Sequence, residues 1–410
     1  MSNFRRVLFL NQYYAPDVAS SGQMLSDLVE GLVEIGPSAT VGCSQPRYES
    51  SVPEAASKDI SAGLKIHRIG MSGTKGRDNF IIRAIGYLRF LILAWIISRR
   101  LIRKEKYDVV IALSNPPFIG IVGALIARKA SVPFVSVMYD IHPDIVQATK
   151  WIKLPGVFFY LWNSVSTWIV RRAIVVVVLG AGMRRTIVET KDSTCEKVKI
   201  IPVWARPEFK SGEYPLPDTR RKFGIAPDEI VILFSGNIGI MQPVDEILRA
   251  ASETRDKKFR FMFLGGGIGS DIIRDFAKEN ELLNISVLPY QPFDDFKSIL
   301  LESDICVVSL SNGMERLSVP SRAYTFLSAG KPIIAIMNSN SDIGNLVREW
   351  DCGWVVSEMR TLSGLLMDLE NDRSSINKKA ARARNAYTST LGKKTSVDSF
   401  SELIFNVTEA

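Results

Sequence analysis

The segment Glu315–Pro332 carries the most informative set of chemical groups in the chain. It combines a carboxylate, several hydroxyl side chains and two arginines with a proline that suits the first turn of a helix. A helix N-terminus and a guanidinium both attract anions, so an anion could sit at the start of this helix with Arg316 or Arg322 supplying the opposite charge. The carboxylate of Glu315 could hold sugar or ribose hydroxyls. An ordinary capped surface helix explains the same residues equally well.

A second candidate is the run Met138–Asp144, which places Asp140, His142 and Asp144 within five residues. The run follows a β-branched segment, and loops at strand ends carry functional residues more often than buried strands do. His142 is one of only two histidines in the chain. A lone histidine is also commonly structural, so this interpretation stays open beside the functional one.

Two loops that contain glycine follow predicted strands. Asn11–Gly22 precedes the first helix, where free backbone N–H groups favour phosphate, and Gly22 would let a ligand approach without a Cβ in the way. Gly265–Gly269 is superficially similar to a dinucleotide fingerprint but lacks its G-x-G-x-x-G order, because position 270 is Ser. We interpret this glycine run as a tight turn between a strand and a helix.

Metal and disulfide chemistry have few residues available. The chain has two histidines and four widely spaced cysteines without a C-x-x-C pair: Cys43, Cys195, Cys306 and Cys352. This pattern favours buried thiols in a reducing compartment over a zinc site or a disulfide framework. We therefore expect neither a metal nor a cofactor.

The elements that position these groups alternate between strands and helices. Apolar spacing predicts helices at Gly22–Ile35 and Ser321–Ala329, among others. Such alternation is typical of a parallel sheet covered by helices on both faces. The predicted strands are Val7–Leu10, Val109–Ala112, Phe134–Tyr139, Ile174–Leu179, Ile230–Ser235, Phe259–Leu264, Ile285–Leu288, Ile305–Ser309 and Pro332–Met337.

Length and the restart of this pattern predict two domains. A chain of 410 residues is too long for one ordinary core, and Pro202–Pro217, rich in proline and polar residues, makes a plausible hinge. We expect an α/β chain of two Rossmann-like domains facing each other across a cleft. The first would span residues 1–205, joined by a C-terminal helix at 388–410, and the second residues 206–387. Ligands of open α/β sheets bind beyond the carboxyl ends of strands, so the cleft is the expected site.

Charge is unevenly divided between the two halves. Residues 1–205 hold 26 Lys and Arg against 15 Asp and Glu, whereas residues 206–410 hold 25 against 28. The basic half contains two interrupted apolar runs, Ile81–Ile102 and Leu154–Val170, neither of which is a convincing membrane span. Apolar groups beside Arg and Lys favour a surface that lies on anionic lipid. A buried helix with a solvated basic end explains either run alone.

Two other interpretations of the basic half find no support in the sequence. No recognised nucleic-acid-binding motif accompanies the charge, so we expect no nucleic acid partner. The first residues run directly into a short apolar strand without the longer apolar core of a signal peptide. We expect a cytoplasmic protein that associates peripherally with the inner face of the membrane.

Several blocks of the chain, taken in order, resemble the family 4 retaining glycosyltransferases. The resemblance is to the bacterial branch that builds exopolysaccharide and O-antigen units, including the colanic-acid and fucosamine transferases. It covers nearly the whole chain and weakens after about Val356. The blocks are Asn11–Asp17 with Gly22, Tyr139–Asp144, Ile201–Ala205, Phe234–Gly239, Pro289–Pro292, and Val319–Tyr324 with Gly330–Pro332.

The resemblance implies a GT-B fold and a metal-independent transfer in which the nucleotide sugar, a UDP-sugar, is a substrate and no cofactor takes part. It implies that the C-terminal domain holds the donor and the N-terminal domain a lipid-linked saccharide acceptor. The implied donor contacts are Tyr290 and Gln291 near the base, Gly236, Asn237 and Gly22 near the diphosphate, and Ser318, Ser321 and Thr325 near sugar and ribose. The candidate catalytic residues are Glu315, Arg322, Asp140 and His142.

The chain departs from the broad family pattern at several places. Thr325 stands where the family has the second Glu of a Glu-x7-Glu pair, and Asn237 and Gln242 stand where it has an Arg and a Lys. The usual loop histidine of the family aligns with Tyr139. We expect Arg322 to take over neutralisation of the diphosphate. The departures leave two alternatives open: a GT-B epimerase acting on a UDP-N-acetylhexosamine, or a non-catalytic, membrane-associated partner of a glycosyltransferase.

Overall fold

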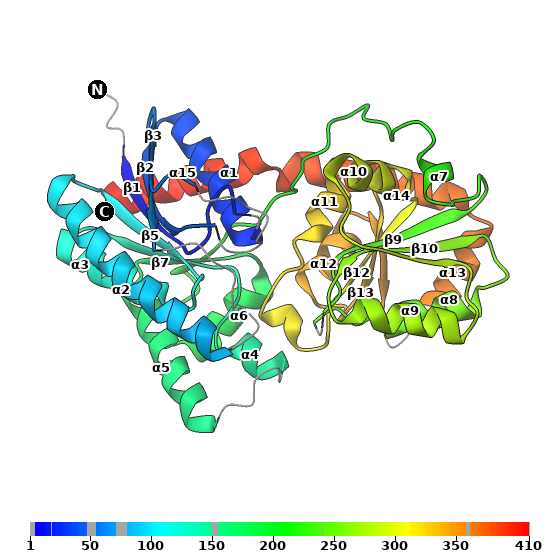
Figure 1. Ribbon diagram of the computed structural model, residues 1–410, viewed down its shortest axis with the longest axis horizontal. Coiled ribbons are helices and arrows are strands. Elements are labelled where there is room, and N and C mark those ends of the chain that lie inside the picture. The colour runs from blue at the N-terminus through cyan, green and yellow to red at the C-terminus, as the bar shows by residue number, and fades with distance from the viewer. Residues whose placement is uncertain are drawn as a thin grey trace. The chain divides into compact units, whose positions relative to one another are not determined.

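The computed structural model describes residues 5–17, 19–46, 55–70, 80–149, 155–239, 241–357 and 361–409 (Figure 1). Contacts between residues divide the chain into two compact units. The N-terminal unit comprises Met1–Pro202 together with Lys393–Ala410, and the C-terminal unit comprises Val203–Gly392. Each unit contains its own β-sheet, so each builds its own core.

The N-terminal unit is built on a sheet of eight strands in the order β3-β4-β2-β1-β5-β6-β7-β8. Neighbouring strands run parallel except β3 and β4, which run antiparallel. The central strands are buried apolar runs because helices cover both faces of the sheet. The strands are β1 Arg6–Leu10, β2 Ser38–Ser44, β3 Lys58–Ser61, β4 Leu64–Ile69, β5 Val109–Leu113, β6 Phe134–Met138, β7 Val175–Val178 and β8 Val198–Ile200.

The last helix of the chain belongs to the N-terminal unit. Helix α15 packs on α1 so closely that a Cβ on Gly31 would lie 2.9 Å from Val397 Cγ2. Its buried face includes Val397, Phe400 and Ile404. The helices of this unit are α1 Ser20–Ile35, α2 Phe80–Lys104, α3 Ile119–Ala130, α4 Asp144–Thr149, α5 Gly156–Arg172, α6 Ala181–Thr190 and α15 Lys393–Glu409.

The two interrupted apolar runs form helices α2 and α5. Within the described parts of the chain, no helix is both long and apolar enough to cross a membrane. Helix α2 has 25 residues and ends in Arg103 and Lys104, and α5 ends in Arg171 and Arg172. The side chains of Ile81 and Arg83, and all of Leu154, lie outside the described residues.

The C-terminal unit contains a fully parallel sheet of six strands in the order β11-β10-β9-β12-β13-β14. Phenylalanines on β9 and β10 fill the centre of its core, where Phe234 and Phe263 pack at 5.9 Å between ring centroids. The strands are β9 Ile230–Asn237, β10 Phe259–Gly266, β11 Ile285–Leu288, β12 Ile305–Ser309, β13 Ile333–Ile336 and β14 Gly353–Val356.

Helices join the successive strands of the C-terminal sheet, and the predicted helix Ser321–Ala329 is present as α11. Two parallel α/β units were predicted, and the structure confirms them. The helices are α7 Thr219–Lys222, α8 Asp245–Glu253, α9 Gly269–Glu279, α10 Phe293–Glu302, η1 Met314–Arg316, α11 Arg322–Ser328, α12 Asp342–Glu349, α13 Leu362–Glu370, α14 Arg373–Ala386 and η2 Tyr387–Leu391.

Each sheet has one place where the order of its strands reverses. In the N-terminal sheet this switch point lies between β1 and β5, and in the C-terminal sheet it lies between β9 and β12. At a switch point the following loops diverge to opposite faces of the sheet, so ligands of open α/β sheets bind beside it, beyond the carboxyl ends of the strands.

Candidate active site

Arg322 lies at the switch point of the C-terminal sheet. Its guanidinium carbon stands 4.8 Å from the ring centroid of Phe234 on β9, and its Nη2 donates a hydrogen bond to the carbonyl of Asn237, 3.1 Å away. Gly236 makes this approach possible: its φ is +110°, and a Cβ there would lie 3.2 Å from Arg322 Cζ. The first residue of α11 is thereby fixed against the end of β9.

The charge of Arg322 has no carboxylate partner in the part of the chain that the structure describes. Its Nη1 is buried without a hydrogen-bond acceptor, and no carboxylate forms an ion pair with it among the described residues. Burial lowers the pKa of the guanidinium to about 10, and the nearby Tyr290 phenol acts in the opposite direction. Arg322 is therefore cationic at neutral pH and has an unused N–H donor at the edge where ligands bind.

The backbone at the start of α11 contributes less than the sequence suggested. The amides of Ala323 and Tyr324 donate to the carbonyls of Pro320 and Ser321, at 3.2 and 3.1 Å. Helix α11 has only seven residues. The side chain of Arg322, rather than a row of open amides, is the group that can hold an anion here.

Tyr290 joins Arg322 at the same edge from the other side of β9. It follows β11, and its ring lies so close to Gly266 at the end of β10 that a Cβ there would be 3.1 Å from Tyr290 Cε2. The ring is 64% exposed, so one face can receive a planar ligand. Gln291 is turned away, because its amide donates to the carbonyl of Pro289 at 2.9 Å.

The glycine run Gly265–Gly269 forms the predicted turn between a strand and a helix, because β10 ends at Gly266 and α9 begins at Gly269. Gly265 and Gly266 continue β10 and pair with Gly236 and Asn237 of β9. A Cβ on Gly267 would lie 2.6 Å from the carbonyl oxygen of Ile238. This tight turn sets the end of β9 directly beside Arg322.

Gln242 is a further site candidate. From the sequence it was noted only because it stands where the broad family has a lysine, and it was not predicted to bind a ligand. Its Oε1 is buried without a donor among the described residues. A Cβ on Gly239 would lie 2.7 Å from Asn237 Nδ2 and 3.5 Å from Gln242 Oε1, so both amides flank the loop after β9. A polar side chain beside a glycine-containing loop is the signal that could have identified it.

Glu315 and Ser318 lie together near the ends of β12 and β13. They line a small hollow with Pro320, Met337 and Asp342. Glu315 sits on the short helix η1 and is half-buried, as are Ser318 and Ser321. The structure thus groups Glu315 with the hydroxyls that precede α11.

Thr325 and Lys331 are carried away from this edge by α11. Thr325 is buried, and its Oγ1 accepts a hydrogen bond from the backbone N–H of Arg206 at 3.3 Å. Lys331 precedes β13 at the opposite edge of the sheet, where its Nζ donates to the carbonyl of Leu301 at 2.7 Å. Only the Glu315–Arg322 part of the predicted segment lies at the carboxyl edge, because a crossover helix must return the chain to the start of the next strand.

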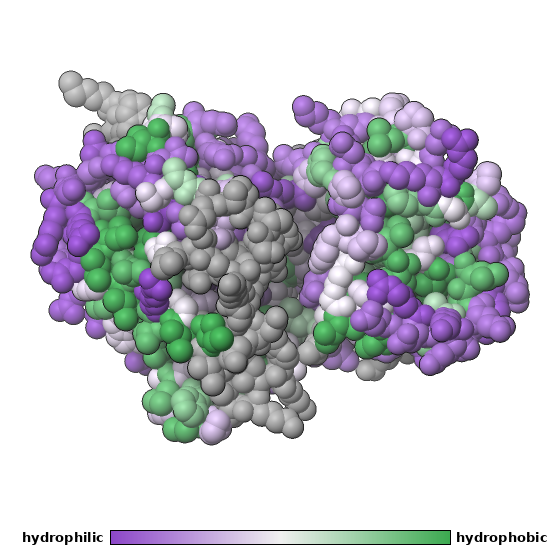
Figure 2. Space-filling model, in the orientation of Figure 1, coloured by the Kyte–Doolittle hydropathy of each residue, from purple (hydrophilic) through white to green (hydrophobic). Residues whose placement is uncertain are grey.

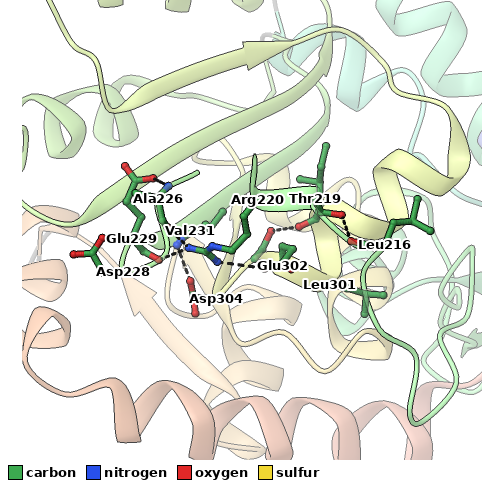
Figure 3. A network of polar contacts seen from close by, with 12 residues as sticks. Leu216, Thr219, Arg220, Ala226, Asp228, Glu229, Val231, Leu301, Glu302 and Asp304 are labelled. Atoms are coloured by element: carbon green, nitrogen blue, oxygen red, sulfur yellow. Dashed lines mark hydrogen bonds and ion pairs between the residues drawn. The ribbon is translucent and has the colours of Figure 1, made fainter. Parts of the chain in front are cut away.

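A network of charged residues occupies that opposite, amino edge of the C-terminal sheet (Figure 3). Arg220 forms an ion pair with Glu302 at 3.3 Å and donates to the carbonyls of Ala226 and Glu229 at 2.7 and 2.9 Å. Asp304 accepts from the backbone of Val231 at 2.7 Å. Each charge here has a protein partner, so the network ties the segment before β9 to the sheet.

Packing within the N-terminal unit explains why position 22 is a glycine. It lies on α1 beneath the loop that follows β1, and a Cβ there would lie 2.8 Å from Tyr13 Cβ. The same loop is fixed by Asn115, whose amide donates to Ser21 Oγ at 2.9 Å. The space beside Gly22 is therefore filled by Tyr13.

Asp140 and His142 follow β6 at the carboxyl edge of the N-terminal sheet. The His142 ring stacks on Trp162 of α5 at 5.8 Å, and its Nδ1 is buried without a partner among the described residues. Burial lowers the pKa of His142, although the Asp140 and Asp144 carboxylates oppose the shift. His142 is accordingly neutral at pH 7 and can accept or donate one proton at the ring.

Two families of known proteins match the chain. Residues 21–204 match the family described as Glycosyl transferase 4-like domain, and residues 217–389 match Glycosyl transferases group 1. The probable glycosyltransferase WbjE of Pseudomonas aeruginosa is 26% identical over 255 residues, 62% of this chain and 63% of that protein. The putative colanic acid biosynthesis glycosyl transferase WcaI of Escherichia coli K12 is 25% identical over 158 residues, 38% of this chain and 39% of that protein. Both alignments span less than two thirds of the relative's length.

Solved structures show the same fold. A sucrose-phosphate synthase from Thermosynechococcus elongatus has a TM-score of 0.76 and 13% identity, over 98% of this chain and 99% of that chain. HepE of Anabaena, solved with UDP and glucose, has a TM-score of 0.70 and 14% identity, over 98% of this chain and all of that chain. At this identity the likeness concerns the fold alone.

Proposed function

Because the chain belongs to the GT-B glycosyltransferases, with a 4-like domain followed by a group 1 domain, we propose that it transfers a sugar from UDP to a lipid-linked saccharide with retention of configuration. The resemblance drawn from the sequence motifs is confirmed at the level of the family. The observation that carries the proposal is the unpaired guanidinium of Arg322 at the switch point of the C-terminal sheet. A largely buried cation without a carboxylate partner among the described residues fits a site whose ligand brings the negative charge.

The donor would lie along the carboxyl edge from β11 to β13. The uracil ring would pack on the exposed face of Tyr290, and the diphosphate would reach Arg322 across Gly236. Glu315 and Ser318, grouped beyond β12, would hold hydroxyls of the ribose or the sugar. HepE was solved with UDP and glucose, which supports a uridine nucleotide as the first donor to test.

Arg322 would act on the leaving group. As the bond between sugar and phosphate breaks, the anomeric carbon becomes cationic and the diphosphate gains negative charge. A guanidinium already fixed beside β9 stabilises that charge without reorganising, which is the main electrostatic route to rate enhancement. The departing phosphate oxygen would take the proton of the acceptor hydroxyl, so this step needs no base from the protein.

The N-terminal unit would hold the acceptor at the surface of a bilayer. Exposed apolar side chains form a stripe along α2 and continue at the start of α5 (Figure 2). Arg99, Arg100, Arg103 and Lys104 follow the stripe on the last turns of α2 and can meet anionic headgroups. The stripe consists of Ile82, Ile85, Leu88, Ile92 and Ile96 on α2, with Val157, Phe158 and Leu161 on α5.

Peripheral binding to the inner face of the cytoplasmic membrane follows from that surface. Lipid-linked saccharides are embedded in the bilayer by their lipid, whereas nucleotide sugars are water-soluble. An enzyme that lies on the membrane by one unit and binds the nucleotide with the other can bring both substrates together. WcaI carries a name from colanic acid biosynthesis, which supports an acceptor in bacterial polysaccharide assembly.

The proposal is tested by supplying both substrates. The protein is incubated with UDP-, GDP- and dTDP-sugars and a lipid diphosphate saccharide in vesicles, and the products are read by mass spectrometry. We expect one added hexose from a UDP-sugar. Conversion of a UDP-sugar in the absence of acceptor would instead identify an epimerase. The absence of any product with every donor would contradict the transferase proposal for these substrates.

A further inference from the structure

The N-terminal unit contains a polar pocket between α4 and α5 that the donor proposal does not use. It has a volume of about 350 Å³, within the range of small-molecule sites. It lies at the carboxyl edge of the sheet, because α4 begins shortly after β6 ends at Met138. Its lining includes Asp144, Gln147, Phe159, Tyr160, Asn163 and Thr190.

A buried lysine fixes two of the polar groups in this pocket. Lys191 is fully buried, and its Nζ donates to Asp144 Oδ2 at 2.6 Å and to Asn163 Oδ1. An ammonium has only donors, so the oxygen of the Asn163 amide faces Lys191 and the NH2 group faces away. The ion pair also uses only one oxygen of Asp144. Among the described residues, the other carboxylate oxygen of Asp144 and the amide NH2 of Asn163 therefore remain, on two side chains that share Lys191 as a partner.

This pair of groups is complementary to neighbouring hydroxyls of a sugar. One hydroxyl can donate to the carboxylate oxygen while the next accepts from the amide, and each keeps its other capacity for water or Gln147. Phe159 and Tyr160 supply aromatic surface for the C–H face of a pyranose ring. The charge of Lys191 is already used, so among the described lining residues no cation is available to bind a phosphate.

We infer that this α4–α5 pocket binds the neutral saccharide end of the acceptor. The inference rests on the proposed function and names the acceptor subsite within it. Val157, Phe158 and Leu161 are exposed on the same helix as Tyr160 and Asn163. A saccharide in the pocket can thus stay attached to a lipid that follows the apolar surface of α5 into the bilayer. Lys191 is a positioning residue, since it acts through Asp144 and Asn163.

The pocket is tested by direct binding to the full chain, independent of turnover. Methyl glycosides of glucose, galactose, rhamnose and N-acetylglucosamine are titrated by saturation-transfer NMR, and UDP is titrated on the same samples. We expect at least one glycoside to bind with a dissociation constant on the order of 1 mM. Tyr160→Ala and Gln147→Ala, both at exposed positions, should weaken it about 5- to 10-fold and leave UDP binding unchanged.

The matched control is Tyr214→Ala, which removes another highly exposed tyrosine ring, 82% exposed against 72% for Tyr160, from the C-terminal unit and should leave glycoside binding unchanged. The pocket assignment is wrong if none of the four glycosides binds, or if both pocket variants bind them like the wild type. The titration with UDP shows whether the donor site works independently of the pocket. Glycoside binding without UDP binding would support the pocket and contradict the donor site.

Discussion

The arginines at the two edges of the C-terminal sheet differ in whether they form ion pairs. At the amino edge, Arg220 pairs with Glu302, and Arg260 meets both carboxylate oxygens of Glu229 at 2.8 to 3.2 Å. At the carboxyl edge, Arg322 contacts the Phe234 ring and one backbone carbonyl, and none of the described carboxylates pairs with it. Both kinds of arginine are partly or largely removed from water.

The difference separates a structural role from a binding role. An ion pair inside a protein offsets the cost of removing two charges from water, and loss of one partner leaves the other unpaired. A cation without a partner lowers the stability of the unliganded protein and becomes favourable when an anion binds. At the amino edge the arginines have their ion-pair partners without any ligand. At the carboxyl edge the charge of Arg322 is balanced only when an anionic ligand binds.

The largest expected effect is at the carboxyl edge. Arg322→Ala should lower kcat/KM for the UDP-sugar about 100-fold or more, because a charged contact to the leaving diphosphate is lost. The unliganded variant should unfold at the wild-type temperature or slightly above it, because the substitution removes a buried cation and leaves no carboxylate unpaired. Arg322→Lys should recover only part of the activity, because an ammonium lacks the planar fork. Steady-state kinetics checks both variants.

The control for this variant is Arg274→Ala, which removes a surface arginine that pairs with Asp271 in the same unit. It should leave kcat/KM at the wild-type level. Wild-type kinetics in Arg322→Ala would show that Arg322 does not contact the donor. The proposed difference in role between the two edges would then be wrong.

Glu315→Gln should have the next largest effect. The substitution keeps the shape of the side chain but removes the charge that would orient sugar or ribose hydroxyls, so turnover should fall about 10-fold or more. Unfolding should be unchanged. Glu349→Gln on the exposed side of α12 is the matched control. A Glu315→Gln enzyme with wild-type kcat would show that the carboxylate takes no part in transfer.

A substitution at the amino edge should lower stability and leave activity unchanged. Arg260→Ala leaves the Glu229 carboxylate without its bidentate partner, so the free energy of unfolding should fall by about 1–3 kcal/mol. The kcat/KM of the folded fraction should stay at the wild-type level. Urea unfolding and kinetics on the same preparation measure both. A loss of kcat/KM as large as that of Arg322→Ala, with stability retained, would overturn the assignment of roles.

The smallest effect concerns pH at the amino edge. Burial raises the pKa of Asp304 above its ordinary value of 3.8, although the Val231 amide opposes the shift. The folded state therefore holds this proton more tightly than the unfolded chain. The contribution of Asp304 to stability is full below about pH 3.8 and is lost as pH rises through the folded pKa.

Asp304→Asn tests whether stability falls as the Asp304 carboxyl group ionises. The amide oxygen can still accept from Val231, so the variant should gain a little stability over the wild type at pH 7.5 and none at pH 4. Urea unfolding at the two pH values measures the difference. A loss of stability at pH 7.5 would mean that the ionised carboxylate contributes favourably at this edge.

The sequence predicted the strands that consist of apolar residues. Val109–Ala112 and Ile230–Ser235 were recognisable because a strand buried on both faces is a nearly continuous apolar run, and the structure extends them to Val109–Leu113 and Ile230–Asn237. Strand β2, with the sequence Ser-Ala-Thr-Val-Gly-Cys-Ser, was not predicted. Its small and polar residues carry no strand pattern of their own, and pairing with β1 and β4 decides its conformation.

The sequence named the candidate site residues without showing which of them lie at the same edge of the sheet. The blocks around Gly236, Tyr290 and Arg322 resemble a glycosyltransferase family in their order and type, and the structure brings these residues to the carboxyl edge of one sheet. The same segment placed Thr325 with them, whereas α11 turns Thr325 towards the backbone of Arg206. Sequence spacing cannot show which turn of a helix faces a ligand and which faces a neighbouring segment.

What the sequence by itself determined is the family, the two parallel α/β units and the presence of a basic residue at the start of α11. What only the tertiary structure decided is that Arg322 contacts the carbonyl of Asn237, 85 residues earlier in the chain, and pairs with no carboxylate of the described residues. The amino edge shows the same dependence, since Arg260 finds Glu229 only through the pairing of β9 and β10. Residue type specifies a charge, but its partner is set by which strands the fold brings together.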